Sequence, residues 1–312
     1  MPGSKSRANS NGGRMMSLPR SMTTYWAAAA LALTAMSARA DIYTLGDSLS
    51  DAGSLDITYT DPAAVNPLVA GRIWIQDLTT STPAFCAQRS KCPWDPRTYY
   101  YGAGNNYAVG GAGVLFDSTD ARTPNTYTSL GAQVASLIGS GKLREGDAVT
   151  VLMGANDIQA AAAKPQSAQA VVVNAAAAFV QYVTALAAQP THPRVYVFTV
   201  PDLGQTPIGR SAADGGAFLS QLTQVFNGEI TTGLRTTPGV SFIISSVIFG
   251  ELAAQLPDYP IYCAKVIDLT HVCGSSSNPV TPSSTSLLFA DPMHPSQVAH
   301  SMIAARLRNI IR

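Results

Sequence analysis

The residue of this sequence best placed to act as a nucleophile is a serine that follows a short apolar segment. Residues 42–44 are IYT, residues 45–51 read LGDSLSD, and Ser48 stands two residues after Gly46. A strand that ends in a tight glycine turn presents such a hydroxyl at the carboxyl edge of a sheet, where open α/β sheets bind ligands. A lone serine hydroxyl is a weak nucleophile and needs a base within hydrogen-bond reach.

A candidate base lies near the other end of the chain, where residues 289–295 read FADPMHP. Asp291 precedes His294 by three residues, so one short loop can place both side chains. The imidazole would then reach Ser48, and the carboxylate would hold the other ring nitrogen in the correct tautomer. We therefore expect Ser48, Asp291 and His294 to form a catalytic triad. The G-x-S-x-G elbow of the α/β-hydrolases is absent, because Ser50 stands where the second glycine would be.

Two further blocks separate the serine from the histidine: VGGAG at residues 109–113 and GAND at residues 154–157. The four blocks, in this order, resemble those of the SGNH (GDSL) hydrolases. Residues 195–204 and 226–227 are similar to the lipase/phospholipase branch of the bacterial secreted GDSL esterases. The resemblance implies an α/β fold, namely the three-layer α/β/α flavodoxin-like fold with a parallel central sheet.

The resemblance also implies an oxyanion hole made by the Ser48 N–H, the Gly111 N–H and the Asn156 side chain. A glycine lets a backbone N–H approach the developing oxyanion without a Cβ in the way. The doubled glycine leaves Gly110 as the alternative donor. Asn156 could instead cap a helix, and we expect Asp157 to be a helix cap or a structural partner.

The remaining acidic residues and histidines have simpler interpretations. Asp47 and Asp51 are expected to hold the serine turn and to cap a following helix, rather than to form a glycosidase-like pair. His192 and His300 are expected at the surface, whereas His271 lies between two cysteines and could touch substrate. Asp291 and His294 could bind a metal, but the sequence offers no third ligand nearby, so we expect no metal. The serine-hydrolase mechanism expected here also needs no organic cofactor.

Strands and helices are expected to alternate along the chain. The expected strands cover 42–45, 106–109, 148–153, 194–200 and 240–247. The expected helices begin near 50 and cover 130–138, 168–188, 218–234 and a terminal segment capped by Ser296. The continuous apolar run 148–153 is typical of a buried parallel strand. The alternation favours a parallel sheet covered on both faces.

Two long loop insertions, 54–105 and 255–288, interrupt this pattern. A loop as long as 54–105 in a compact domain is usually a lid or a binding insertion. The first loop is rich in aromatic residues: Tyr59, Trp74, Phe85, Trp94, Tyr99, Tyr100 and Tyr101. We expect some of these rings to line the acyl or alcohol pocket, with simple loop packing as the alternative.

Four cysteines lie in these loops as two close pairs. In an exported protein such spacing suggests disulfides, although four cysteines allow three connectivities. We expect neighbours to pair, as Cys86–Cys92 and Cys263–Cys273. Zinc binding is disfavoured because there is no C-x2-C motif and no nearby pair of histidines.

Residues 1–40 are expected to be a signal peptide cleaved after Ala40. They contain five basic residues, no acid, and an apolar run at 25–36 before the small-x-small site Ala38-Arg39-Ala40. The apolar run is shorter than the about 20 residues that span a bilayer. Residues 41–312 would form one hydrolase domain, extracellular or periplasmic, since the chain ends one helix after His294.

Charge also narrows the classes of partner. When the five basic residues of the leader are left out, 15 of the 20 basic residues and all 19 acidic residues remain, which gives a net charge of −4. A slightly acidic chain without basic runs does not suit nucleic acid. The Ala-rich stretch 160–188 contains polar residues and is expected to be a packed helix, so no membrane span is expected in the mature chain.

The function expected from these features is that of a secreted serine esterase or lipase, which hydrolyses small-molecule or lipid carboxylic esters through an acyl-serine. The alternative within enzymes is a phospholipase or a lipid acyltransferase. A catalytically silent binding protein on the same fold is the non-enzyme alternative, but it predicts the loss of a triad residue. All four named positions, Ser48, Gly111, Asn156 and His294, are present.

Overall fold

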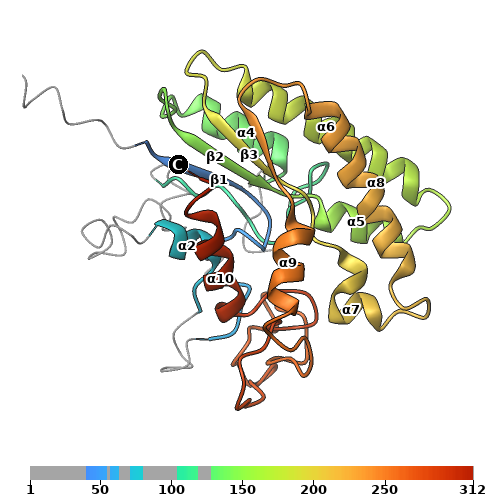
Figure 1. Ribbon diagram of the computed structural model, residues 1–312. Coiled ribbons are helices and arrows are strands. Elements are labelled where there is room, and N and C mark those ends of the chain that lie inside the picture. The colour runs from blue at the N-terminus through green and yellow to red at the C-terminus, as the bar shows by residue number, and fades with distance from the viewer. Residues whose placement is uncertain (1–39, 55–56, 63–70, 80–103, 119–127, 312) are drawn as a thin grey trace, which may run out of the picture. The chain divides into compact units, whose positions relative to one another are not determined.

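A computed structural model describes residues 40–54, 57–62, 71–79, 104–118 and 128–311. Its centre is a four-stranded sheet in the order β1-β2-β3-β4 (Figure 1). The strands are β1 (Ile42–Gly46), β2 (Ala148–Leu152), β3 (Arg194–Phe198) and β4 (Val240–Ile243). All three pairings are parallel, as the alternation of strands and helices predicted. The carboxyl ends of the strands therefore meet at one edge of the sheet.

The expected strand at 106–109 is an extended segment along the outer edge of β1. Thr44 N donates to Asn105 O (2.9 Å), Tyr107 N donates to Thr44 O (2.8 Å), and Val109 N donates to Gly46 O (3.1 Å). The segment forms an isolated parallel bridge, Thr44↔Asn106, rather than a regular strand. With this segment outside β1, the order of the sheet is the flavodoxin-like one, and its switch point lies between β1 and β2.

One face of the sheet is covered by four helices: α4 (Leu130–Gly139), α5 (Ala155–Ala162), α6 (Ala168–Ala187) and α8 (Ala217–Leu234). Their buried side chains form one hydrophobic core with Leu45, Val151 and Val197. Within the part of the chain that the structure describes, α6 is the one helix long and apolar enough to cross a membrane. Its Val172, Phe179, Val183 and Leu186 are fully buried in this core, which confirms the helix predicted over 168–188. The single packed helix expected over 160–188 is wrong in its bounds, because turns at 163–167 separate α5 from α6.

The other face is covered by α2 (Trp74–Thr79), α9 (Ser245–Ala253) and α10 (Gln297–Leu307). A second core joins these helices to Leu152, Phe198 and Ile243 of the sheet. Successive strand residues thus point into different cores, as expected for a sheet buried on both sides. The described part of the chain therefore has the predicted three-layer α/β/α fold.

Several expected boundaries are wrong. No helix begins near Ser50: residues 47–54 form turns, because the Asp51 carboxylate accepts from the N–H groups of Gly53 and Ser54. The strand expected over 240–247 ends at Ile243, and α9 begins at Ser245. The apolar residues of α9 recur at helical spacing and bury Ile248 and Leu252 in the second core.

The two predicted insertions differ in what they contain. The first is not wholly irregular, since α2 lies within it; residues 55–56, 63–70 and 80–103 lie outside the described residues. The second is described completely, and residues 254–296 contain turns and isolated bridges but no helix or regular strand. The structure joins Cys263 to Cys273 by a disulfide, in agreement with the expected pairing. Cys86 and Cys92 lie outside the described residues.

Two short helices, η3 (Leu203–Gln205) and α7 (Pro207–Arg210), follow β3.

Candidate active site

Ser48 lies on the turn that follows β1, at the carboxyl edge of the sheet. Gly46 ends the strand beside β2, and a Cβ there would lie 2.6 Å from the Leu152 carbonyl oxygen. The buried Gln133 side chain holds this end of the strand by accepting from Gly46 N (2.8 Å) and donating to Gly46 O (2.9 Å). The turn is closed by a bond from Ser50 N to Asp47 O (3.0 Å). Glycine is therefore required where the backbone of β1 passes that of β2.

The structure brings the three expected triad residues into one hydrogen-bonded chain. The Ser48 Oγ lies 2.9 Å from His294 Nε2, and His294 Nδ1 lies 2.7 Å from Asp291 Oδ2. All three residues are buried, with 8% of Ser48, 3% of His294 and none of Asp291 exposed. These are hydrogen-bond distances between residues 246 positions apart in sequence.

The Asp291 carboxylate is surrounded by donors. Oδ1 accepts from Met293 N and His294 N, and Oδ2 accepts from Ile267 N and the imidazole. Burial alone would raise the pKa of Asp291, but the electrostatic interaction with His294 and these hydrogen bonds hold that pKa below its usual value. An ionised carboxylate only accepts hydrogen bonds, so His294 Nδ1 carries the proton and Nε2 is free to accept from Ser48.

The loop that carries both residues is a tight turn with its own backbone bonds. Ala290 N donates to His294 O (2.8 Å), and Phe289 forms an antiparallel bridge with Pro295. Ser296 then caps α10, as predicted, by accepting from Ala299 N (3.1 Å). The ring of Tyr59 lies against the His294 ring, with centroids 5.2 Å apart. One short loop therefore places the base and its carboxylate.

The three expected oxyanion donors lie at the ends of the three adjacent segments. Within the described residues, the N–H groups of Ser48 and Gly111 have no hydrogen-bond acceptor. The Gly110 N–H donates to Asp51 Oδ2 (2.7 Å), which favours Gly111 over the alternative glycine. Gly111 has a φ of +76°, a conformation that suits glycine.

Asn156 lies in the first turn of α5 and not at its cap. Gly154, with a φ of 126°, occupies the N-cap position, so the capping role considered for Asn156 is not the one it has. One hydrogen of the Asn156 amide is used, because Nδ2 donates to Ala112 O (2.8 Å). An amide nitrogen has two hydrogens, so the second can point at a ligand. Asp157 is a structural partner, as expected: its carboxylate accepts from Val114 N (2.7 Å) and Leu115 N (3.2 Å).

The two acidic residues beside Ser48 bind backbone. Asp51 accepts from Gly110 N and, as described above, from its own turn, so it ties the serine turn to the glycine turn. Asp47 Oδ1 accepts from Leu49 N (3.0 Å), and its Oδ2 is buried without a partner among the described residues. Burial raises the pKa of Asp47 to about 7 despite the Leu49 hydrogen bond. The expected turn-holding role fits both residues, although no helix follows for them to cap.

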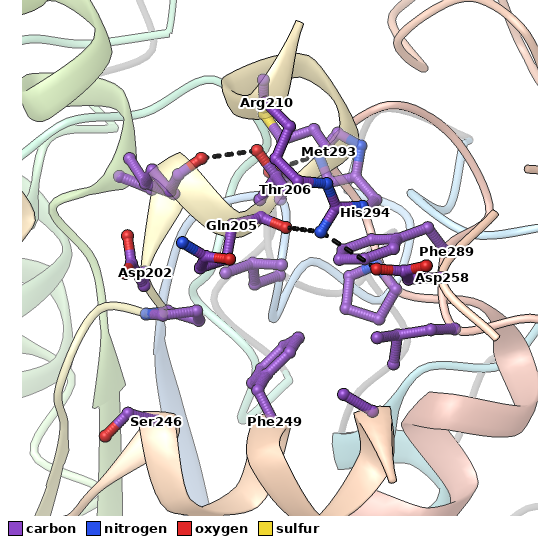
Figure 2. Close-up of a pocket in the computed structure, with 18 of the residues that line it drawn as sticks. Asp202, Gln205, Thr206, Arg210, Ser246, Phe249, Asp258, Phe289, Met293 and His294 are labelled. Carbon is purple, nitrogen blue, oxygen red and sulfur yellow. Dashed lines mark hydrogen bonds and ion pairs between the residues drawn. The ribbon is translucent and has the colours of Figure 1, made fainter. Parts of the chain in front are cut away.

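A cavity of about 340 Å³ opens beside Ser48, Asn156 and His294. Much of its wall is apolar: Leu49, Leu203, Phe249, Leu288, Phe289 and Met293. Figure 2 shows Phe249 and Ser246 of α9 opposite Thr206 and Arg210. Arg210, which also lines the cavity, pairs with Asp258 (3.0 Å) and donates to Gln205 O (2.6 Å).

The cavity wall is a finding that the sequence did not predict. Most of its described lining comes from residues 201–210, α9 and the 288–295 loop, and no pocket wall was expected from these segments. Of the seven aromatic residues expected to line it, Trp74 is buried in the second core against Phe198 and Tyr59 touches His294. The other five lie outside the described residues. No local motif marks these wall residues, because they come from three separate segments.

The other three histidines are not part of the hydrogen-bonded triad. His192 is exposed, as predicted. His271 pairs with Asp268 (3.1 Å) and is absent from the lining of the cavity beside Ser48. The surface position expected for His300 is wrong, since only 1% of it is exposed. α10 packs against α2 and α9 and so buries a wider arc than its apolar stripe indicated. Among the described residues, no group of three or more His, Cys, Asp or Glu side chains could hold a metal ion.

Comparison with known proteins identifies a family for this chain. Residues 42–307 match the family described as GDSL-like Lipase/Acylhydrolase. The chain belongs to this family. It is 29% identical over 239 residues to Lipase 1 of Photorhabdus luminescens. That match covers 71% of this chain and 33% of the relative, so the chain spans about a third of the relative's length.

Two esterases are among the solved structures to which this chain is similar. An acetylxylan esterase from Geobacillus stearothermophilus, Axe2, is 14% identical, with a TM-score of 0.44 over 87% of this chain and 94% of that one. A carbohydrate acetylesterase from Sinorhizobium meliloti is 12% identical, with a TM-score of 0.45 over 87% and 97% of the two chains.

Proposed function

We propose that this member of the GDSL-like family is a carboxylic ester hydrolase that works through an acyl-serine intermediate on Ser48. The observation that carries the proposal is the buried hydrogen-bond chain from Ser48 Oγ through His294 to Asp291. A serine with its base at 2.9 Å, and a carboxylate that orients the base, is the arrangement that activates a hydroxyl nucleophile.

In the proposed reaction, Ser48 Oγ attacks the ester carbonyl carbon while His294 Nε2 takes the serine proton. The tetrahedral oxyanion is held by the N–H groups of Ser48 and Gly111 and by the Asn156 amide. The intermediate collapses when the bond to the alcohol oxygen breaks, and His294 returns the proton to that oxygen. Water, deprotonated by His294, then attacks the acyl-serine. His294 returns this proton to Ser48 Oγ as the bond between Oγ and the acyl carbon breaks, which releases the carboxylic acid and free Ser48. Asp291 stabilises the imidazolium in both halves of the reaction.

The substrates proposed are neutral esters with an apolar acyl group. The apolar wall of the cavity beside Ser48 suits a hydrocarbon chain, and the name of the Photorhabdus relative, Lipase 1, agrees with such a substrate. The cavity is also lined by the carboxylates of Asp202 and Asp258 against one guanidinium, Arg210, which is already paired. This balance favours neutral esters over anionic phosphodiesters at this site.

A fluorophosphonate probe tests the mechanism, and p-nitrophenyl esters from acetate to palmitate test the substrate. Purified protein should react with the probe and hydrolyse the esters, whereas Ser48→Ala should do neither. Labelling that persists in Ser48→Ala would refute Ser48 as nucleophile. No labelling of the wild type, together with tight binding of an ester analogue, would support the silent binding protein instead.

The proposal includes export. The pattern of residues 1–40 supports a signal peptide, with 41–312 as one hydrolase domain, and the Cys263–Cys273 disulfide suits an oxidising compartment. Protein recovered from the periplasm or the medium of an expressing bacterium should begin at Asp41. A product that stays in the cytoplasm with its leader intact would refute export.

A further inference from the structure

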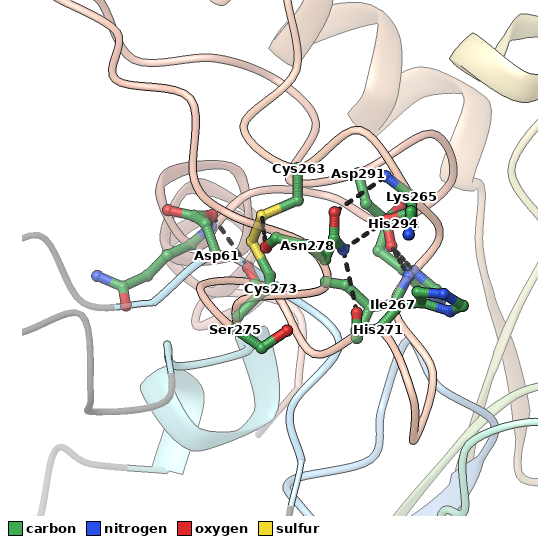
Figure 3. Close-up of a disulfide and its surroundings, with 12 residues drawn as sticks. Asp61, Cys263, Lys265, Ile267, His271, Cys273, Ser275, Asn278, Asp291 and His294 are labelled. Atoms are coloured by element: carbon green, nitrogen blue, oxygen red, sulfur yellow. Dashed lines mark hydrogen bonds and ion pairs between the residues drawn. A yellow bond between two sulfur atoms is a disulfide. The ribbon is translucent and has the colours of Figure 1, made fainter.

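The Asp291 carboxylate receives one hydrogen bond from a distant loop. Ile267 N donates to Asp291 Oδ2 (2.6 Å), and this is the same oxygen that holds His294 Nδ1 (Figure 3). The contact is buried, since 2% of Ile267 is exposed. The two bonds to Oδ1 come from Met293 and His294, within the turn of Asp291 itself. Among the described residues, Ile267 is thus the one donor from another segment that helps to set the rotation of the carboxylate.

The segment that carries Ile267 has no regular structure to hold it in place. It lies within residues 254–296, where no helix or regular strand is present. A free loop samples many conformations, and a cross-link that closes it removes much of that freedom. The Cys263–Cys273 disulfide closes the loop around Ile267. Cys263 N also donates to Ala290 O (2.7 Å), which ties the start of the loop to the residue before Asp291.

A second fastening is the side chain of Asn278, which is 1% exposed. Its Oδ1 accepts from Lys265 N (3.0 Å), and its Nδ2 donates to Lys265 O (2.9 Å) and His271 O (3.0 Å). Asn278 therefore binds the loop on both sides of Ile267. The disulfide and the amide together define where the Ile267 N–H lies.

We propose that loop 263–278 is a positioning element for Asp291, in which the Cys263–Cys273 disulfide and Asn278 hold the Ile267 N–H on the carboxylate. The inference rests on the proposed function, because Asp291 matters there as the partner of His294. It adds an element outside the triad loop on which the rate of the reaction depends. Ile267, Asn278 and the cysteines touch no substrate in this proposal; they act through Asp291.

The test compares three variants of the purified protein with the wild type. Cys263→Ser/Cys273→Ser opens the loop, and Asn278→Ala releases it with the disulfide intact. Ser283→Ala is the matched control, because Ser283 is exposed in the same irregular segment and does not line the cavity. Small misplacement of a catalytic group costs up to about 100-fold in rate. We expect kcat to fall roughly 10- to 100-fold in the first two variants with KM within about twofold, and to stay unchanged in the control.

Reduction provides the same comparison without a substitution. Dithiothreitol converts the disulfide to two thiols and is itself oxidised to the cyclic disulfide. It should lower kcat in the wild type and in the Ser283→Ala variant, and should have no further effect on Cys263→Ser/Cys273→Ser. Thermal unfolding shows which proteins are folded at the assay temperature. If the opened-loop variant does not fold, reduction of folded wild type takes its place.

A readout independent of activity separates this inference from the proposed function. The His294 Nδ1 proton, bonded to Asp291, should give a low-field proton NMR signal that His294→Gln lacks. We expect Asn278→Ala or reduction to broaden the signal or shift it upfield. If the wild type is inert on esters but the signal responds, the proposed function fails and the positioning role stands. An unchanged signal and an unchanged kcat with the loop open would overturn the positioning role, as would an equal loss in the Ser283→Ala control.

Discussion

The polar residues around Ser48 have divided tasks that their types alone do not reveal. Asp51 binds the backbone of its own turn and that of Gly110, while Asp47 binds the Leu49 N–H. The Ser48 and Gly111 N–H groups remain without an acceptor among the described residues. These two N–H groups are the ones proposed to bind the negatively charged oxygen that develops in acyl transfer.

Replacing Asn156 with alanine tests this at the level of one side chain. Loss of one oxyanion donor costs about 10²–10³ in kcat, and KM should change little because the amide would act mainly in the transition state. Asn174→Ala, at an exposed site on α6, is the matched control. Since Asn156 also holds Ala112 O, the melting temperature should be recorded for both. A kcat within threefold of wild type would remove Asn156 from the proposed mechanism.

His300 makes a prediction about acid stability. Burial lowers the pKa of His300 to about 3, and both ring nitrogens are buried without partners among the described residues. The unfolded chain takes up a proton as the pH falls through about 6.5, whereas the folded protein does not until about 3. As far as His300 is concerned, the folded protein therefore has its full stability above pH 6.5. Between pH 6.5 and about pH 3, His300 lowers the unfolding free energy by about 1.4 kcal/mol for each unit by which the pH is lowered.

Asp47 changes the stability of the fold with pH in the opposite direction to His300. The wild type must therefore be compared at each pH with a variant that lacks only His300. Its raised pKa means that the folded protein binds the extra proton between about 7 and the ordinary 3.8, which favours folding as the pH falls. His300→Leu removes the pH dependence of stability that His300 causes and keeps the one that Asp47 causes. From pH 7.5 to pH 4.5 the variant should gain about 2–3 kcal/mol relative to wild type in urea unfolding. Parallel curves for the two proteins would show that His300 does not titrate in this way.

At the level of elements, α9 forms one wall of the cavity beside Ser48. The helix was not expected from the sequence, and its Ser246, Phe249, Gly250 and Ala253 all line the cavity. A Cβ at Gly250 would meet no atom within 4 Å. A larger side chain can therefore be added at Gly250 without a clash at its Cβ, beside the space proposed for the acyl chain.

Gly250→Phe should shorten the preferred acyl chain. We expect kcat/KM for long p-nitrophenyl esters to fall about tenfold relative to acetate, as binding energy for a few methylenes is lost. Gly228→Phe on α8 is the control, since its Cβ would also meet nothing within 4 Å and it does not line the cavity. Both changes remove a glycine from a helix and so alter helix propensity alike. An equal fall across all chain lengths would show that α9 is not the acyl wall.

At the level of the whole molecule, the hydrophobic core formed by α4, α5, α6 and α8 contacts the turn before Asn156 through Phe226. The Phe226 ring packs on Gly154, where an added Cβ would lie 2.5 Å from it, and Gly154 directly precedes the helix that carries Asn156. Phe179 is buried in the same core and contacts Phe226 edge-on, with centroids 5.9 Å apart. The two rings differ in that Phe226 is the one that supports the Asn156 turn.

The two rings therefore make a matched pair. Phe226→Ala and Phe179→Ala should each cost about 3–5 kcal/mol of unfolding free energy. Measured on folded protein well below its melting temperature, Phe226→Ala should also lower kcat several-fold, whereas Phe179→Ala should leave kcat near wild type. Equal kcat in the two variants would mean that the core does not position Asn156.

The sequence by itself determined the fold class, the family and the candidate triad. It could do so because each of these depends on local information: apolar runs of strand length, and short blocks in which Ser48, Asn156 and His294 follow strand ends or turns. The parallel sheet brings the first two blocks to one edge wherever the helices lie, because parallel strands share a carboxyl edge.

Only the tertiary structure decided what surrounds those residues. The helix α9, the burial of His300 and the hydrogen bond from Ile267 to Asp291 join segments far apart in the chain. An apolar run such as 240–253 fits a strand or a helix equally well until its partners are known. The walls of the cavity, which are proposed to set the substrate preference, arise from packing between distant segments. No short motif can therefore predict them.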